Sequence, residues 1–345
     1  MSERDDLTAL IADTIKDYRA GKPFAPTPDH VDRWVCQFDE IVQVPLLREM
    51  DFVLKRTYFS SERVTDFLKT AITTKKWAGD NPCEFWKRAN FLNIQLGGNS
   101  QREMLTLFDK LLIEQCGYSN ESCGGGDNFI YLDDAVFTGN RVLKDLKNWI
   151  KGDAPSKATV HIVSIVLHKG ADYYVSREIH TIADGVGKTI HDKWSPFLKL
   201  ETRKAYSDRA DVLRPTVIPD DPDVREYVAG MRHKPTMRSP GNIGGNKLFS
   251  SDEGKALLEQ EFLKAGAKIR KTCPNLGEYM RPLGNMLLEE LGFGSLFVTY
   301  RNCPNTAPLA LWVADPWYPL FPRTTNRQTE DIRSISTLIP FEGSE

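Results

Sequence analysis

Two adjacent carboxylates, Asp133 and Asp134, follow an apolar run and precede a turn that contains Thr138 and Gly139. Carboxylates accept hydrogen bonds from hydroxyl groups, and the free N–H groups at the start of a helix bind anions. This order of residue types suits a ligand that carries neighbouring hydroxyl groups and, about one sugar ring away, a phosphate. The alternative is a solvated turn in which the two acids only cap a helix.

The residues around these acids have the pattern of a strand, a loop and a helix. Residues 129–132 are wholly apolar, which is typical of a buried strand in a parallel sheet. After the turn, apolar residues recur at helical spacing: Val142, Leu143, Leu146, Trp149 and Ile150. In open α/β sheets, ligands bind outside the carboxyl ends of the strands, so both acids are expected at the mouth of a crevice.

A second segment has the same order of elements. Residues 91–96 are largely apolar and predict another strand, and the apolar spacing over residues 104–112 predicts a buried helix face. Between them lie Gly97, Gly98, Asn99, Ser100 and Gln101. Glycines let the backbone approach a ligand closely, although such a sequence also forms ordinary turns.

The string of apolar residues, two acids, three variable positions and Thr-Gly resembles the phosphoribosyl-pyrophosphate motif of class I phosphoribosyltransferases. The resemblance implies that Asp133 and Asp134 bind the ribose hydroxyl groups and support reaction at the anomeric carbon. It implies that the 5′-phosphate is wrapped by Phe137, Thr138, Gly139, Asn140 and Arg141. The loop over residues 97–101 would receive the pyrophosphate, with Mg²⁺ as the cofactor bound there and no direct protein ligand.

Two positions depart from that motif. Phe137 stands where purine salvage enzymes often carry an acid that contacts the incoming base, and Phe has no titratable group. Arg141 replaces the usual Ser or Thr, which either strengthens phosphate binding by its charge or blocks the pocket. Residues 114–128 are too few for the long catalytic hairpin of many family members. Because no general base is evident, the acceptor is expected to be water or a group activated by the C-terminal section.

Strand and helix patterns alternate in the middle of the chain, which predicts a parallel sheet. Strands are expected near residues 91–96, 129–132 and 160–167. We therefore expect an α/β fold with a parallel sheet of the phosphoribosyltransferase type flanked by helices. The expected sections are an N-terminal helical section (1–88), the α/β core (89–200) and a C-terminal α+β extension (201–345) with helices near 252–266 and 280–291 and a late strand over 296–300.

Composition excludes few function classes. The chain has 345 residues, and its 45 basic and 47 acidic residues nearly balance, which gives no global argument for nucleic acid or an acidic membrane surface. The six cysteines and six histidines lack metal-ligand spacing. No apolar run suggests export or membrane insertion, so a cytoplasmic protein with reduced cysteines is expected, with no membrane partner.

The flanking segments carry a second resemblance. Residues 31–38, 57–60, 299–312 and 317–323 look like those of phosphoribosyltransferase-like effectors from bacterial conflict systems, including some that accompany retron reverse transcriptases. This likeness implies a toxic effector in anti-phage defence, with a reverse transcriptase or nucleoprotein as partner. Just beyond the late strand, Arg301, Asn302 and Asn305 would contact a base or second substrate.

Three functions stay open on the sequence. The first is a phosphoribosyltransferase-like defence effector that binds phosphoribosyl pyrophosphate or a nucleotide and transfers or hydrolyses at the anomeric carbon. The second is a non-catalytic sensor of a sugar phosphate or nucleotide that regulates a partner, which the residues at 137 and 141 favour. The third is a protein-interaction module in which the N-terminal helices hold the partner.

Overall fold

The chain divides into two compact units. The computed structural model describes residues 2–19, 25–75, 79–95, 100–200, 211–273 and 275–323. One unit comprises Met1–Ser60 and Ala205–Glu345, and the other, the α/β unit, comprises Ser61–Lys204. Compared with the three expected sections, residues 61–88 join the α/β unit, and residues 1–60 join the C-terminal part.

A parallel four-stranded sheet forms the centre of the α/β unit, in the order β2-β3-β4-β5. Its strands are β2 (Asn90–Phe91), β3 (Asn128–Val136), β4 (Lys157–His168) and β5 (Thr189–Leu200). The three expected strands correspond to β2, β3 and β4, which confirms the α/β class with a parallel sheet. The strand β5 was not expected because it lies at the sheet edge and mixes polar residues with Pro196, so it lacks an apolar run.

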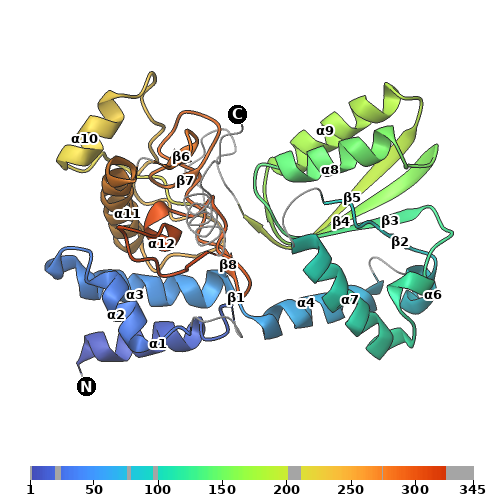
Figure 1. Cartoon of the computed structure of the whole chain (residues 1–345), viewed down its shortest axis with the longest axis horizontal. Helices are drawn as coiled ribbons and strands as arrows, with labels where there is room; N and C mark the ends of the chain where they lie inside the picture. The colour runs from blue at the N-terminus through green and yellow to red at the C-terminus, as the bar shows by residue number, and fades with distance from the viewer. Residues whose placement is uncertain are drawn as a thin grey trace, which may run out of the picture. The chain divides into compact units, whose positions relative to one another are not determined.

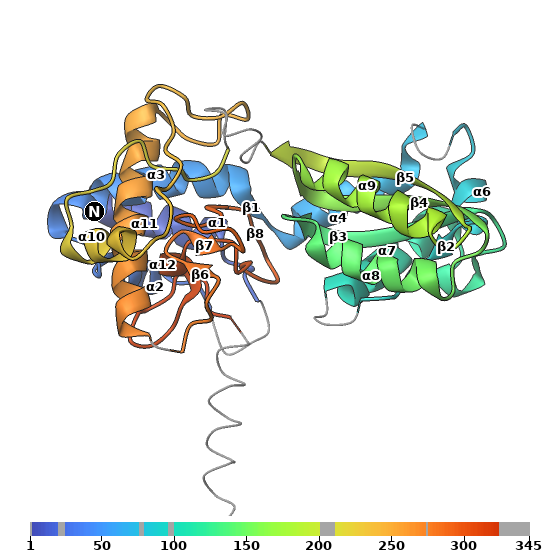
Figure 2. The same ribbon diagram turned by 90° about the horizontal axis from the view of Figure 1, so that it is seen from above.

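Helices cover both faces of this sheet (Figure 1 and Figure 2). On one face α8 (Asn140–Lys151) packs against α9 (Ala171–Asp184), and on the other α7 (Ser100–Cys116) contacts α4 (Ser61–Thr73). The helical spacing expected after the turn is present, since the buried side of α8 carries Val142, Leu146, Trp149 and Ile150. These side chains join residues of β3, β4 and α9 in one apolar core.

The other unit is mainly helical. Its helices in the described residues are α1 (Glu3–Thr14), α2 (Pro28–Val35), α3 (Glu40–Thr57), α10 (Pro222–Ala229), α11 (Asp252–Thr272) and α12 (Leu309–Trp312). A parallel pair joins β1 (Tyr58–Phe59) to β8 (Val298–Thr299), which lies within the expected late strand. This pairing of distant segments is the physical reason that residues 1–60 belong with the C-terminal part.

The prediction of a helix near residues 280–291 is wrong. A short antiparallel hairpin of β6 (Met280–Arg281) and β7 (Gly284–Asn285) occupies this region. Gly284 has a φ of 106°, and a side chain there would collide with the backbone of Thr306. The close approach of a distant backbone segment therefore overrides the local apolar spacing.

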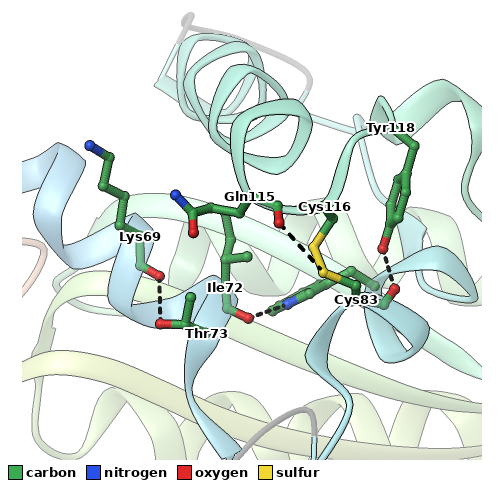
Figure 3. Close-up of a disulfide and its surroundings, with 8 residues drawn as sticks. Lys69, Ile72, Thr73, Cys83, Gln115, Cys116 and Tyr118 are labelled. Atoms are coloured by element: carbon green, nitrogen blue, oxygen red, sulfur yellow. Dashed lines mark hydrogen bonds between the residues drawn. A yellow bond between two sulfur atoms is a disulfide. The ribbon is translucent and has the colours of Figure 1, made fainter.

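A disulfide joins two helices of the α/β unit. Cys83 lies in α6 (Pro82–Lys87) and Cys116 ends α7, and their Cα atoms are 5.5 Å apart (Figure 3). The hydroxyl of Tyr118 donates to the Cys83 carbonyl beside it. The disulfide corrects the expectation of fully reduced cysteines, which rested on spacing alone. Cys83 and Cys116 are 33 positions apart in sequence and come together only because their helices pack. No helix in the described ranges combines the length and apolarity needed to cross a membrane.

We expect loss of this disulfide to lower the stability of the α/β unit. Closing a loop of this length stabilises a fold by roughly 3–4 kcal/mol in the chain-entropy account. Calorimetry of the Cys83→Ser/Cys116→Ser variant should show a melting temperature several degrees lower, and Cys123→Ser, which removes a free thiol, is the control. Six titratable thiols in the unreduced, denatured protein, rather than four, would contradict the bond.

Candidate functional site

The acid pair lies within β3 and not after it. The strand was expected to stop at residue 132, but it continues to Val136, so Asp133 and Asp134 lie in its C-terminal half. Asp133 is in register with Ser164 of β4, and its side chain is almost completely buried, with 2% exposure. Asp134 is half-buried. Pairing with β4 therefore draws one acid into the unit and leaves the other nearer the surface.

Ser100, the first residue of α7, is hydrogen-bonded to Asp133. Its hydroxyl donates to Asp133 Oδ1 over 3.1 Å, and the backbone N–H of Asp134 donates to the same oxygen over 2.9 Å. Asp134 Oδ1 in turn accepts from the N–H of Ala135 at 2.9 Å. The structure thus brings Ser100, from the loop over residues 97–101, to the acid pair. Ser100 and Asp133 are 33 residues apart in sequence.

Burial and a neighbouring like charge disfavour ionisation of Asp133. Desolvation, followed by the negative charge of Asp134, raises the pKa of Asp133 well above its usual value, and the Ser100 hydroxyl only partly offsets this. A buried carboxyl group with a raised pKa is typical of functional sites. Ligand hydroxyl groups that donate hydrogen bonds to these acids would favour their ionised forms.

Two glutamines fix the start of α7. Gln101 Oε1 accepts from the N–H groups of Ile94 and Gln95 at 2.8 and 2.9 Å, and Gln95 Oε1 accepts from the N–H of Gln101 at 3.2 Å. Gln95 Nε2 also donates to Ser100 Oγ at 3.1 Å. Gln95 was not among the predicted residues, because one glutamine in a loop gives no sequence signal.

The remaining residues of that loop are only partly described. Gln101 is fully buried, and its Nε2 has no hydrogen-bond partner in the part of the chain that the structure describes. The predicted residues Gly97, Gly98 and Asn99 lie outside the described residues. Their contact with a pyrophosphate stays a prediction.

The turn after β3 requires glycine. Gly139 has a φ of 81° and stands at the N-cap of α8, and an added Cβ would lie 2.5 Å from Val175 Cγ2. Among the described residues no side chain caps the helix, and the closest substitute is a 3.5 Å contact from the Asn140 N–H to Thr138 Oγ1. Thr138, Asn140 and Arg141 are exposed. The first N–H groups of α8 are therefore candidates for binding an anion.

The N–H groups at the start of the neighbouring helix α9 are hydrogen-bonded differently. Asp172 Oδ1 accepts from the N–H groups of Gly170 and Tyr173 at 3.1 and 3.0 Å, so an acid of the helix itself satisfies its start. By contrast, α8 has no acid in its first turn and carries Arg141 there. A cation at this end opposes the helix dipole, so its presence fits a site that attracts a negatively charged group.

Phe137 packs against His168, the last residue of β4. The ring centroids are 4.9 Å apart, and His168 is completely buried. Burial lowers the pKa of His168 to about 3, so this imidazole is neutral at physiological pH and is a weak proton acceptor. Its place beside the site was not predicted, because a histidine that ends an apolar strand gives no distinguishing pattern.

The predicted base contacts lie in the other unit. There the Arg301 guanidinium is 5.9 Å from the centroid of the Tyr300 ring, and the N–H of Asn302 donates to the Thr299 carbonyl at 3.1 Å. The carbonyl of Asn305 accepts from the N–H of Asn285 at 2.8 Å. Contact of Arg301, Asn302 and Asn305 with a ligand stays a prediction.

Comparison with known protein families identifies the chain. A family model described as PRTase-CE matches residues 31–323, which is most of the sequence. The chain belongs to the PRTase-CE family. No curated protein and no solved structure matches it. Membership of this family together with the parallel sheet confirms the expected phosphoribosyltransferase-like fold.

In this PRTase-CE protein, we expect Asp133→Asn to stabilise the fold at neutral and alkaline pH. Folding raises the pKa of Asp133. The favourable contribution of this residue to the stability of the fold is therefore complete below its pKa in the unfolded chain and is lost as pH rises through its pKa in the folded protein. Asparagine keeps the acceptor oxygen and avoids the buried charge. The free energy of unfolding should rise by about 1–3 kcal/mol at about pH 8.

Denaturant unfolding at several pH values measures this effect. The gain should shrink as pH falls toward the usual range of a carboxyl group, and Asp153→Asn, at an exposed position, is the control. A gain that does not depend on pH, or a loss of stability at alkaline pH, would show that Asp133 is not held in this way.

Proposed function

We propose that this PRTase-CE protein binds phosphoribosyl pyrophosphate or a nucleotide and transfers or hydrolyses at the ribose anomeric carbon. The observation that carries the proposal is that three groups with matching chemistry lie in one unit. These are the acid pair Asp133–Asp134, the start of α7 at Ser100, and the uncapped start of α8. Each has a matching part in a ribose that carries a phosphate at one end and a pyrophosphate at the other.

The acids suit the ribose hydroxyl groups. Each carboxylate accepts hydrogen bonds from vicinal hydroxyl groups, and the bond from Ser100 fixes the orientation of Asp133 in advance. Backbone N–H groups also donate to Asp133 Oδ1 and Asp134 Oδ1, which further fixes the orientation of both acids. Binding would therefore need little rearrangement of these side chains.

The α8 start suits the 5′-phosphate. The first N–H groups of the helix and the hydroxyl of Thr138 offer hydrogen-bond donors, and Arg141 adds a positive charge. Because Gly139 has no side chain, the turn approaches α9 closely. This role makes Arg141 a reinforcement of the phosphate site rather than an obstruction.

Mg²⁺ fits this arrangement as an ion bound mainly by the pyrophosphate. The described residues contain no group of three or more His, Cys, Asp or Glu that could hold a metal, and Mg²⁺ is commonly bound by one or two carboxylates with substrate phosphates and water. When bound, the ion would neutralise charge on the leaving pyrophosphate.

The side chains around the turn favour an acceptor that needs little deprotonation. Phe137 has no proton to exchange, and the neutral His168 behind it is a weak base. With phosphoribosyl pyrophosphate, the bond between the anomeric carbon and the pyrophosphate oxygen would break through an oxocarbenium-like state supported by the two carboxylates, and pyrophosphate would leave. Water or a second substrate would then bond to the anomeric carbon and give up its proton to solvent. With a nucleotide, the bond that breaks would be the C–N bond, and the base would leave. The same pair of rings favours the second candidate, a sensor that binds the ligand without turnover.

The biological setting that we propose is anti-phage defence in the cytoplasm, with a reverse transcriptase or nucleoprotein as partner. Its support is the resemblance of the flanking segments to conflict-system effectors. Loss or transfer of the ribosyl group would deplete a nucleotide or its precursor in the infected cell, which suits a toxic effector.

Calorimetry with phosphoribosyl pyrophosphate and Mg²⁺, followed by mass spectrometry of the mixture, tests the proposal. We expect micromolar binding and a ribose product, and we expect Asp133→Asn/Asp134→Asn to weaken binding by about a hundredfold. The double variant Asp153→Asn/Asp184→Asn removes two exposed acids of the same unit and is the charge-matched control. Binding without product would select the sensor, and absence of binding would refute both candidates.

A further inference from the structure

A buried polar pair lies beneath the candidate site. The hydroxyl of Tyr131 on β3 donates to Asp145 Oδ2 on α8 over 2.9 Å. Tyr131 is fully buried within the apolar core that α8 and α9 form with the sheet, and Asp145 is 3% exposed. Neither residue was singled out from the sequence, and neither belongs to the motif of acids and turn.

Stability alone does not explain this pair. Removing a carboxylate from water is costly, and well-packed apolar residues of similar volume often replace a buried polar pair with no loss of stability. Apolar contacts are not directional, whereas a hydrogen bond fixes a distance and an angle between the two elements that it joins. The pair therefore has a positional effect that its apolar neighbours lack.

The bond joins the two halves of the candidate site. Tyr131 precedes Asp133 by two residues and so lies on the same face of β3. Asp145 lies in the second turn of α8, just beyond the hydrogen bond from the Leu143 N–H to the Gly139 carbonyl, 2.9 Å long, that closes the first turn. A shift of α8 along the sheet would therefore break this bond and would move the helix start relative to the acids.

Arg141 is linked to the same pair. It precedes Asp145 by one helical turn, the spacing at which side chains of a helix are neighbours. Burial and the charges of Asp133 and Asp145 raise the pKa of Tyr131, and the charge of Arg141 opposes them, which places all four groups within electrostatic reach.

We infer that Tyr131 and Asp145 are positioning residues of the sugar-phosphate site, holding the α8 start and Arg141 at a fixed distance from the acid pair. The inference rests on the proposed function for its ligand. Its structural part, a directional connection between β3 and the first turn of α8, stands on the hydrogen bond itself.

The decisive variant is Tyr131→Phe/Asp145→Leu in the full chain. Its melting temperature should stay within a few degrees of the wild type, while its affinity for phosphoribosyl pyrophosphate with Mg²⁺ should fall by about tenfold or more. Asp145→Asn keeps an acceptor for the tyrosine hydroxyl and should stay within about threefold of the wild type. Tyr174→Phe removes a hydroxyl next to the same core and is the control.

Amide hydrogen exchange gives a readout that needs no ligand. In the double variant, protection of the Leu143 amide should fall by about tenfold, while protection of the Ile150 amide near the other end of α8 should not change. Tyr131→Phe alone should act in the same direction, which keeps the test valid if the double variant fails to fold. Unchanged Leu143 protection, or wild-type affinity in the double variant, would overturn the inference.

The two readouts separate this inference from the proposed function. If the wild type does not bind phosphoribosyl pyrophosphate but Leu143 protection falls in the variants, the positioning role is supported and the proposed ligand is refuted. If the wild type binds and the variants bind equally well, the proposed function stands and the positioning role is refuted.

Discussion

Burial of the Asp133 carboxyl group beside Asp134 is the constraint on which the candidate site depends. The register of β3 with β4 draws Asp133 into the unit, and the hydroxyl of Ser100 and the backbone of Asp134 hold it there. Burial and the neighbouring charge of Asp134 raise the pKa of Asp133. Carboxyl groups with a perturbed pKa are typical of functional sites, and the proposed ligand has vicinal hydroxyl groups that can donate to such oxygens.

The two helix starts after β3 and β4 show how the chain separates structure from function. Both have a left-handed glycine at the N-cap, Gly139 and Gly170. Asp172 closes the start of α9 with its own carboxylate, whereas α8 has no such cap and carries a cation in its first turn. Below this open start, the bond between Tyr131 and Asp145 ties α8 to the strand that carries the acids. Together these features place the α8 start at a defined position relative to the acids, as the proposed phosphate site requires.

Local patterns in the sequence were sufficient for the parallel sheet and for the strand, turn and helix around the acids, because apolar periodicity and a Thr-Gly turn are properties of neighbouring residues. They were insufficient where distant residues decide the structure. The edge strand β5 has no apolar run, the pairing of β1 with β8 joins opposite parts of the chain, and the disulfide joins two helices. The hydrogen bond from Ser100 to Asp133 also joins residues that are distant in sequence, and the residues next to each of them do not predict it.

The central claim is that the acid pair and the adjoining turn bind a ribose phosphate, and an amide NMR titration with ribose 5-phosphate tests it most directly. The account predicts saturable shifts of the amides of residues 134–135 and 138–142, with little change at the start of α9, where Asp172 already occupies the N–H groups. Shifts at the start of α9 with none at residues 134–142, or no saturable shift at all, would contradict it.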